Sequence, residues 1–168
     1  MSPWPYKIIW LGLLVVQPLR ADWEVRQEPD PLAGKSVCLL SSETLATEDG
    51  YGEARVRLVL NQQALLAVAD SHIDPSFADL TLVVDDNPPL PFDRLAGDDI
   101  LVFERDREVI IERFRAGYNA TLQLRFWPTW PATQRFPVTF SLIGFTRAHE
   151  QFQLCLGPER DGAQSAGS

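Results

Sequence analysis

The chain has 168 residues, of which 45% are apolar and 23% are charged, a composition typical of a globular domain with its own core. Its formal net charge at pH 7 is −8, so its long-range field repels nucleic-acid phosphates and anionic lipids. We therefore expect no nucleic-acid partner. Basic partners are mildly favoured, although the simplest role of the charge is to keep the domain soluble.

The first residues predict a secretory signal. Lys7 precedes an uninterrupted apolar run at residues 8–16, and Pro18 ends any helix that this run forms. The run is shorter than the roughly 20 residues that a membrane span requires. We expect cleavage after Ala21, which would remove residues 1–21 and leave no integral membrane span. Retention of the segment as an N-terminal anchor is the alternative.

Cys38 and Cys155 are the only cysteines. In an exported chain two cysteines most simply form one disulfide, which here would join the first part of the domain to its last element. Chain-entropy estimates give a loop of this size roughly 4–5 kcal/mol of stabilisation. Two buried free thiols are the competing interpretation. A catalytic thiol is less favoured, because neither cysteine has a C-x-x-C partner.

Strand patterns dominate the first two thirds of the sequence. Trp23 and Val25 alternate with polar residues, and Val56, Leu58 and Leu60 recur at the same period of two, which is typical of strands. The predicted strands cover residues 22–27, 35–43, 54–61, 62–70, 80–86 and 99–106. Turn-forming residues separate them, and this spacing predicts an all-β sandwich or barrel.

Two later segments have helical features. At residues 106–117, Asp106 is placed to cap the helix and Gly117 to end it. The apolar face would contain Val109, Ile110 and Phe114. The β-branched run at 109–111 makes a strand the alternative. Residues 144–154 predict a short helix that packs on the sheet edge through Phe145, Ala148 and Phe152.

The remaining segments complete one domain. Residues 118–126 and 135–142 are expected to form a hairpin. The tail at 157–168 is small and polar, and we expect it to be disordered. The sequence therefore predicts a mainly β, β-sandwich-like single domain at residues 22–156 with one or two short helices.

Several short motifs resemble the invasion-associated locus B family of bacterial exported proteins. Trp23 lies in an opening "DWEV", Cys38 in "SVCLL", and Gly117 closes a helix before "YNATLQLRF". The family pattern S-L-x-G-F-x-x-A is matched by Ser141, Leu142, Gly144, Phe145 and Ala148. The resemblance implies a β-sandwich-like periplasmic or surface protein, from a family named for a role in host-cell entry, with no established catalytic residues.

One segment has a weak pattern for metal binding. Asp70, His72 and Asp74 alternate, so in an extended strand their side chains would share one face. The segment runs into a turn at Pro75, where solvated Asp and His residues are ordinary, and we favour that interpretation. The H-E-x-x-H motif fails after His149, because Gln153 stands where the second histidine is required.

The strongest candidate for a binding site is the loop in "RFWPTWPATQRF". Trp127 and Trp130 lie in a connection between strands, where polar turn residues would be expected, with Arg125 and Arg135 on either side. Aromatic loops on a rigid β scaffold commonly bind partners, because they offer a large contact area at low entropy cost. In the alternative, which the sequence slightly favours, both tryptophans fold back to cover one end of the sandwich.

These patterns predict an exported, non-catalytic binding protein of the bacterial cell envelope, in the periplasm or at the cell surface. We expect no catalytic residue and no cofactor, and the partner to be another protein or an envelope component. The second hypothesis is an exported inhibitor of a basic enzyme such as a lysozyme, because an acidic domain associates rapidly with a basic target. The third is a metal-dependent enzyme that uses Asp70, His72 and Asp74.

Overall fold

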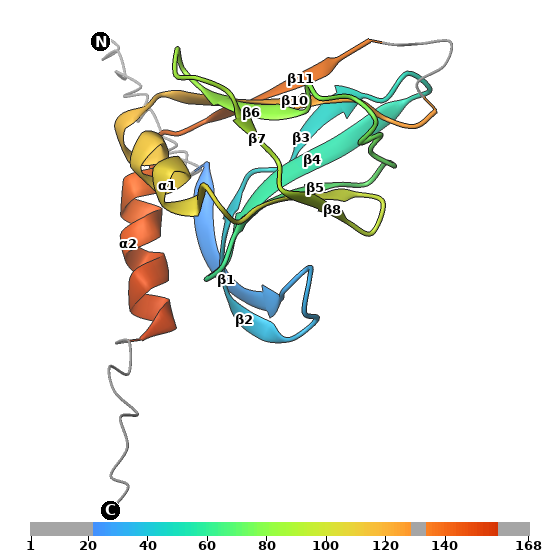
Figure 1. Cartoon of the computed structure of the whole chain (residues 1–168). Helices are drawn as coiled ribbons and strands as arrows, with labels where there is room; N and C mark the ends of the chain where they lie inside the picture. Colours follow the sequence, from blue (N-terminus) through green and yellow to red (C-terminus); the bar gives the residue numbers. More distant parts are fainter. Residues whose placement is uncertain (1–21, 129–133, 158–168) are drawn as a thin grey trace, which may run out of the picture.

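The computed structural model describes residues 22–128 and 134–157, which form a mainly β, sandwich-like domain of two antiparallel sheets and two helices (Figure 1). The predicted fold class is therefore confirmed. The expected signal at 1–21, and all of the expected tail except Gly157, lie outside the described residues. Neither helix of the described part of the chain has the length and apolar character that crossing a membrane requires.

The larger sheet has the strand order β1-β2-β4-β5-β9-β8, with β3 also paired to β4. Its strands are β1 (Trp23–Pro29), β2 (Ser36–Ser42), β3 (Leu45–Glu48), β4 (Glu53–Leu60), β5 (Leu65–Ala69), β8 (Arg94–Ala96) and β9 (Ile100–Phe103). The smaller sheet has the order β11-β10-β6-β7. It contains β6 (Thr81–Val84), β7 (Leu90–Pro91), β10 (Asn119–Leu124) and β11 (Phe136–Ser141).

One main core fills the space between the two sheets, because side chains along their strands alternate between the inner and the outer face, as a sandwich requires. In β10 and β11 every second residue is buried, so the smaller sheet presents one apolar face to the core and one polar face to solvent. β4 contributes Val56, Leu58 and Leu60, as the sequence predicted. Val59 points the other way but is also fully buried, in a second cluster on the opposite face of the larger sheet.

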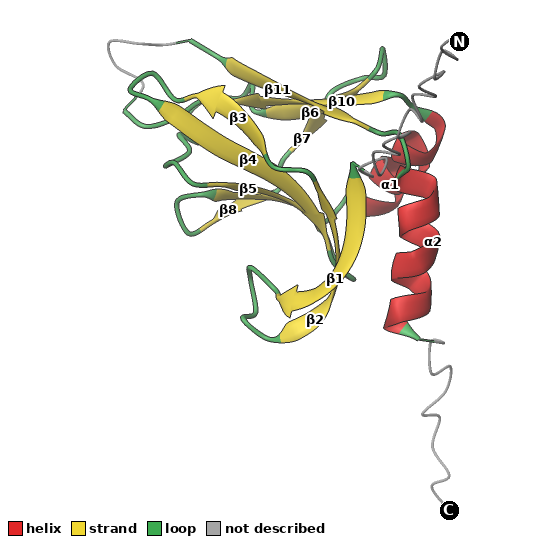
Figure 2. Cartoon of the chain, turned by 180° about the vertical axis from the view of Figure 1, so that it is seen from behind, coloured by secondary structure: helices red, strands yellow, loops and turns green. Residues whose placement is uncertain are grey.

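The helices α1 (Arg107–Ala116) and α2 (Phe145–Leu156) lie side by side at the end of the sandwich next to β1 (Figure 2). Both helix predictions are confirmed, and the strand alternative for 109–111 is wrong. The buried face of α1 consists of Ile110, Ile111 and Phe114, while Val109 is 39% exposed, so the predicted face was rotated by one residue. Asp106 occupies the N-cap position, but its side chain makes no capping hydrogen bond.

Gly117 is required by close packing rather than by a left-handed backbone, since its φ is −96°. A Cβ atom there would lie 2.7 Å from Asp85 Oδ2 and 2.8 Å from Val84 Cγ1. The Asp85 carboxylate accepts hydrogen bonds from the backbone N–H groups of Tyr118 and Asn119, at 3.0 and 2.9 Å, and so cannot move away freely.

We expect Gly117→Ala to lower the free energy of unfolding by about 1–3 kcal/mol, because the added methyl group forces this junction apart. Urea unfolding measures the change. Gly52→Ala is the matched control, because nothing lies within 4 Å of the added Cβ there, and its unfolding curve should stay close to that of the wild type. Equal stability of Gly117→Ala and the wild type would contradict the close approach.

The predicted disulfide is confirmed. Cys38 of β2 is bonded to Cys155 in the last turn of α2, with the two Cα atoms 6.0 Å apart. The bond spans 117 positions of sequence. It holds α2 against β1 and β2, the two strands of the larger sheet that this helix contacts. The C-terminal helix is thus tied covalently to the strand pair that begins the domain.

His149 lies on the buried face of α2, between Phe145 and Phe152, and is only 7% exposed. Burial lowers the pKa of this imidazole below the usual 6.5, and the nearby charges of Arg115 and Arg107 add to that shift. Its Nε2 atom is 3.3 Å from Gln153 Nε2, which can only donate, so the arrangement suits a neutral ring.

The free energy of unfolding should therefore fall as the pH drops below about 6.5. Because the folded-state pKa is lowered, the unfolded chain takes up the proton first, and the protonated form is favoured only after unfolding. Urea titrations between pH 7.5 and 5.5 test this, and His149→Gln should remove the fall. His72→Gln, which changes the exposed histidine, should still lose stability as the pH falls. A dependence of stability on pH that is the same in His149→Gln as in the wild type would contradict the role of His149.

Candidate functional site

A surface hollow of about 340 Å³ lies where three separate segments of the chain meet. We call it the Trp127 pocket, and it is lined by His72, Ile73, Asp74, Pro75, Ser76, Leu95, Asp98 and Trp127. Leu95 belongs to β8, Asp98 to the turn between β8 and β9, and Trp127 follows the end of β10. The two candidate segments that the sequence suggested separately, around His72 and around Trp127, therefore line the same pocket.

Backbone hydrogen bonds hold the pocket wall in place. Ile73 forms an isolated antiparallel bridge with Phe126. On either side of this bridge the Trp127 N–H donates to the His72 carbonyl at 2.7 Å, and the Asp74 N–H donates to the Arg125 carbonyl at 2.9 Å. The Ile73 N–H donates to the Asp98 carbonyl at 2.7 Å, so all three segments form one fixed frame.

Trp127 is exposed because the chain alternates at this point. Phe126 is 1% exposed and packs on Phe136, with ring centroids 5.8 Å apart, so the next side chain points outward. The side chain of Trp127 is 61% exposed. The alternative in which the tryptophans fold back over the sandwich is therefore wrong for Trp127. Trp130 lies outside the described residues, and its role as a binding residue stays a prediction.

Arg125, which the sequence predicted to flank the binding loop, has a mostly buried side chain that is paired with Asp79. Its guanidinium donates two hydrogen bonds to Asp79, at 2.9 Å to Oδ1 and 2.7 Å to Oδ2, and lies 4.3 Å from the centroid of the Phe77 ring. Its side chain is 12% exposed. These hydrogen bonds are the largest cause that lowers the pKa of Asp79 below the usual carboxyl range.

Arg135 is the more accessible of the two predicted arginines. Its side chain is 57% exposed, and its Nε atom lies 3.9 Å from Asp79 Oδ2. Asp79, which the sequence did not single out, therefore holds Arg125 and lies close to Arg135. No local sequence pattern indicates that Asp79 pairs with Arg125, because the two residues are 46 positions apart.

Two of the three residues of the metal hypothesis, Asp70 and Asp74, accept hydrogen bonds from backbone N–H groups. Asp70 Oδ1 accepts the backbone N–H of Arg55 at 2.6 Å, and Asp74 Oδ1 accepts that of Ser76 at 2.9 Å. Asp74 is 2% exposed, whereas His72 is exposed, so the three do not share one open face. Within residues 22–128 and 134–157, no three His, Cys, Asp or Glu side chains are placed to bind a metal ion together. The structure therefore does not support the metal site.

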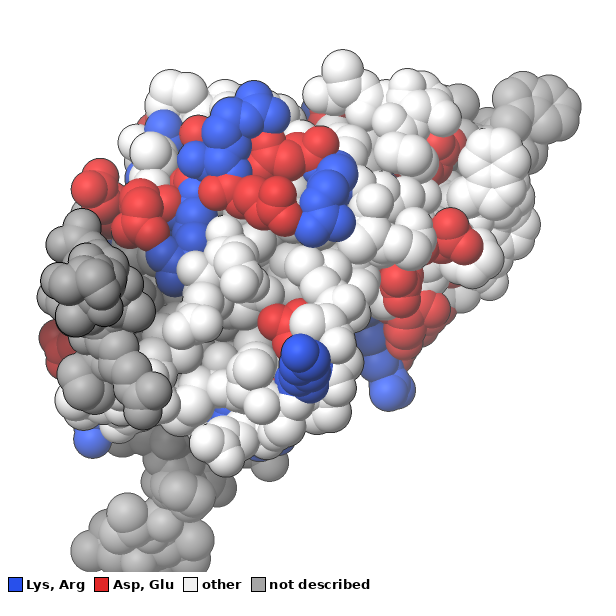
Figure 3. Space-filling view, turned by 60° about the horizontal axis from the view of Figure 1, so that its bottom comes forward, with Lys and Arg blue, Asp and Glu red and all other residues white. Residues whose placement is uncertain are grey.

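Charges of both signs are mixed on one face of the molecule (Figure 3). On the face shown in Figure 3, acidic and basic side chains lie next to one another. Ion pairs such as Arg94–Glu104 at 2.7 Å and Arg57–Glu28 at 3.0 Å show the same arrangement. The Trp127 pocket carries two carboxylates, Asp74 and Asp98, beside an imidazole and an indole. It offers a flat aromatic contact with polar groups around it, as binding sites for partner segments do.

No family model matches this chain, and no curated protein and no solved structure matches it. The fold and the pocket define a disulfide-linked, sandwich-like β domain with an exposed tryptophan at a surface hollow. The resemblance to the invasion-associated locus B family stays a prediction from the sequence motifs.

Proposed function

We propose that this chain is an exported, non-catalytic binding protein of the bacterial cell envelope, akin to the invasion-associated locus B family, and that the Trp127 pocket binds an exposed segment of a partner protein. The observation that carries the proposal is the exposed indole of Trp127 on a fixed frame of backbone hydrogen bonds. A tryptophan exposed on a rigid edge contributes strongly to binding, because little entropy is lost when it is covered. The disulfide supports an oxidising compartment outside the cytoplasm.

Affinity capture from an envelope fraction, followed by measurement of the dissociation constant with the purified partner, tests the proposal. Trp127→Ala should weaken binding at least tenfold, as the loss of a central aromatic contact does. Tyr118→Ala is the matched control, because Tyr118 is 76% exposed and is not among the residues that line the Trp127 pocket, so its affinity should be unchanged. Equal affinities of Trp127→Ala and the wild type would overturn this assignment.

The net charge of −8 supports the second candidate, an inhibitor of a basic enzyme such as a lysozyme. A lysozyme activity assay at low and at high salt separates the two. An inhibitor steered by charge should lose potency as salt rises. A partner held mainly through Trp127 should depend much less on salt.

A further inference from the structure

In the part of the chain that the structure describes, no strand pairs with the outer edge of β3 in the larger sheet. β2 and β3 both lie on the same side of β4, with Leu40 opposite Leu60 and Leu45 opposite Val56. β1 covers only β2, because its pairing begins with Trp23 opposite Ser42. Among the described residues β3 therefore pairs with β4 alone, and none of them continues the row of β1 alongside it.

The hydrogen-bond register shows which backbone groups of β3 lie on its outer edge. Asp49 N–H donates to the Gly52 carbonyl at 3.0 Å, next to the pair of Glu48 with Glu53. In an antiparallel ladder hydrogen-bonded pairs alternate with pairs that are not bonded. Thr47 therefore directs its N–H and C=O toward β4, whereas Ala46 and Glu48 direct theirs outward.

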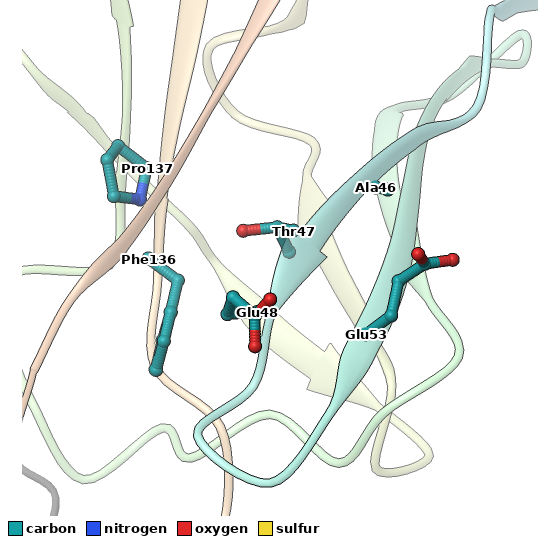
Figure 4. Close-up of a pocket in the computed structure, with 6 residues that line it drawn as sticks. All are labelled: Ala46, Thr47, Glu48, Glu53, Phe136 and Pro137. Atoms are coloured by element: carbon teal, nitrogen blue, oxygen red, sulfur yellow. The ribbon is translucent and has the colours of Figure 1, made fainter.

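A hollow of about 360 Å³ opens beside this edge. It is lined by Ala46, Thr47, Glu48, Glu53, Phe136 and Pro137 (Figure 4). β11 runs along its far side, close to β3 but in the other sheet, without a ladder between the two strands. Figure 4 shows Glu48 between β3 and Phe136. An extended chain placed along β3 would thus run beside the residues that line this hollow.

The edge of β11 is less suited to pairing than that of β3. Pro137 has no N–H to donate. The Ser141 carbonyl already accepts the Trp23 Nε1–H at 2.8 Å. Proline on an edge strand is a common way to block added strands. Among the described residues nothing obstructs β3 in this way, because Ala46 and Glu48 each offer both a donor and an acceptor.

The charges at this edge indicate a basic ligand. Glu48 and Glu53 are directly opposite in the register, an arrangement of like charges that is destabilising across a strand pair. Glu53 lies 3.4 Å from Arg55 Nε, a pair that is exposed on both sides and so contributes little. Among the described residues Glu48 has no ion-pair partner. A Lys or Arg side chain of a bound strand would relieve the repulsion.

We propose that the outer edge of β3 binds an extended, basic segment of a partner protein as an added strand, next to β3 and in line with β1. Backbone hydrogen bonds to Ala46 and Glu48 supply the pairing, and the two glutamates, which lie at the same level of the ladder, select a Lys or Arg side chain at the position beside Glu48. This site is separate from the Trp127 pocket and does not depend on the function proposed for it.

Binding of a labelled synthetic peptide with Lys at alternate positions, followed by fluorescence anisotropy at low salt, tests the proposal. Glu48→Gln should weaken binding at least fivefold, and Ala46→Pro, which removes an outward N–H, at least tenfold. A copy of the peptide with N-methyl groups on the backbone nitrogens that face β3 should fail to bind. Trp127→Ala should bind the peptide as the wild type does, which separates this site from the Trp127 pocket.

Amide hydrogen exchange gives a second readout that does not need a variant to fold. The peptide should slow exchange at the N–H groups of Ala46 and Glu48. Equal binding of the N-methylated peptide would mean attraction by charge alone and would overturn the proposal, as would an absence of binding at millimolar peptide. Self-association of the wild type that Ala46→Pro abolishes would assign the edge to a second copy of the chain, and this too would overturn it.

Discussion

Replacement of both Cys38 and Cys155 by alanine is expected to lower the free energy of unfolding by about 3–5 kcal/mol. The bond closes a loop across 117 positions, so its loss releases a large amount of conformational freedom in the unfolded chain. Total stabilities of small domains are about 5–15 kcal/mol, so this is a large share. The packing of α2 should survive, because Phe145, Ala148 and Phe152 stay buried without the bond.

Urea unfolding with and without a reducing agent separates the bond from the side chains. The reduced wild type should have the same free energy of unfolding as the double alanine variant. The reducing agent should not change the free energy of unfolding of that variant. The exposed residues that follow Phe152 should gain the fastest amide exchange, because the bond is the covalent link between the last turn of α2 and β2. An unfolding midpoint of the wild type that does not change on reduction would contradict the stabilising role.

The long elements could be predicted because their periods are local properties of the sequence. β4 repeats its apolar residues with a period of two, and α2 repeats its own at helical spacing, so both were found close to their observed ends. β3, β7 and β8 were not predicted. They have only 4, 2 and 3 residues, and they are strands because of the neighbours they pair with.

The candidate site was predictable in its parts but not in its assembly. Sequence reasoning singled out Trp127 for its place in a strand connection and His72 for its neighbours. Nothing local shows that these residues line one pocket, because the bridge between Ile73 and Phe126 joins segments far apart in sequence. The inward position of the Arg125 side chain could not be predicted for the same reason, since it depends on Asp79 and Phe77.

Trp23→Ala should lower the free energy of unfolding by about 3–5 kcal/mol, because it removes the largest side chain of the core. This side chain lies where β1, α1 and α2 meet. Trp23 is 2% exposed. Its ring meets those of Phe114 and Phe145 edge to face, with centroids 5.8 and 5.0 Å away, and these two rings are themselves 5.2 Å apart. The three rings join β1, α1 and α2, and edge-to-face contacts add to the apolar area that they bury.

Trp23→Phe separates packing from hydrogen bonding at this junction. It keeps an aromatic ring beside Phe114 and Phe145 but loses the 2.8 Å bond from Nε1 to the Ser141 carbonyl, which ties β1 to the smaller sheet. We expect the free energy of unfolding to fall by about 1–2 kcal/mol, well below the loss in Trp23→Ala. The Ser141 carbonyl loses its hydrogen bond, and the smaller ring leaves a small void. Urea unfolding of the two variants beside the wild type gives both values. Equal losses would contradict the stabilising role of the three-ring contact and assign the contribution of Trp23 to its hydrogen bond with Ser141.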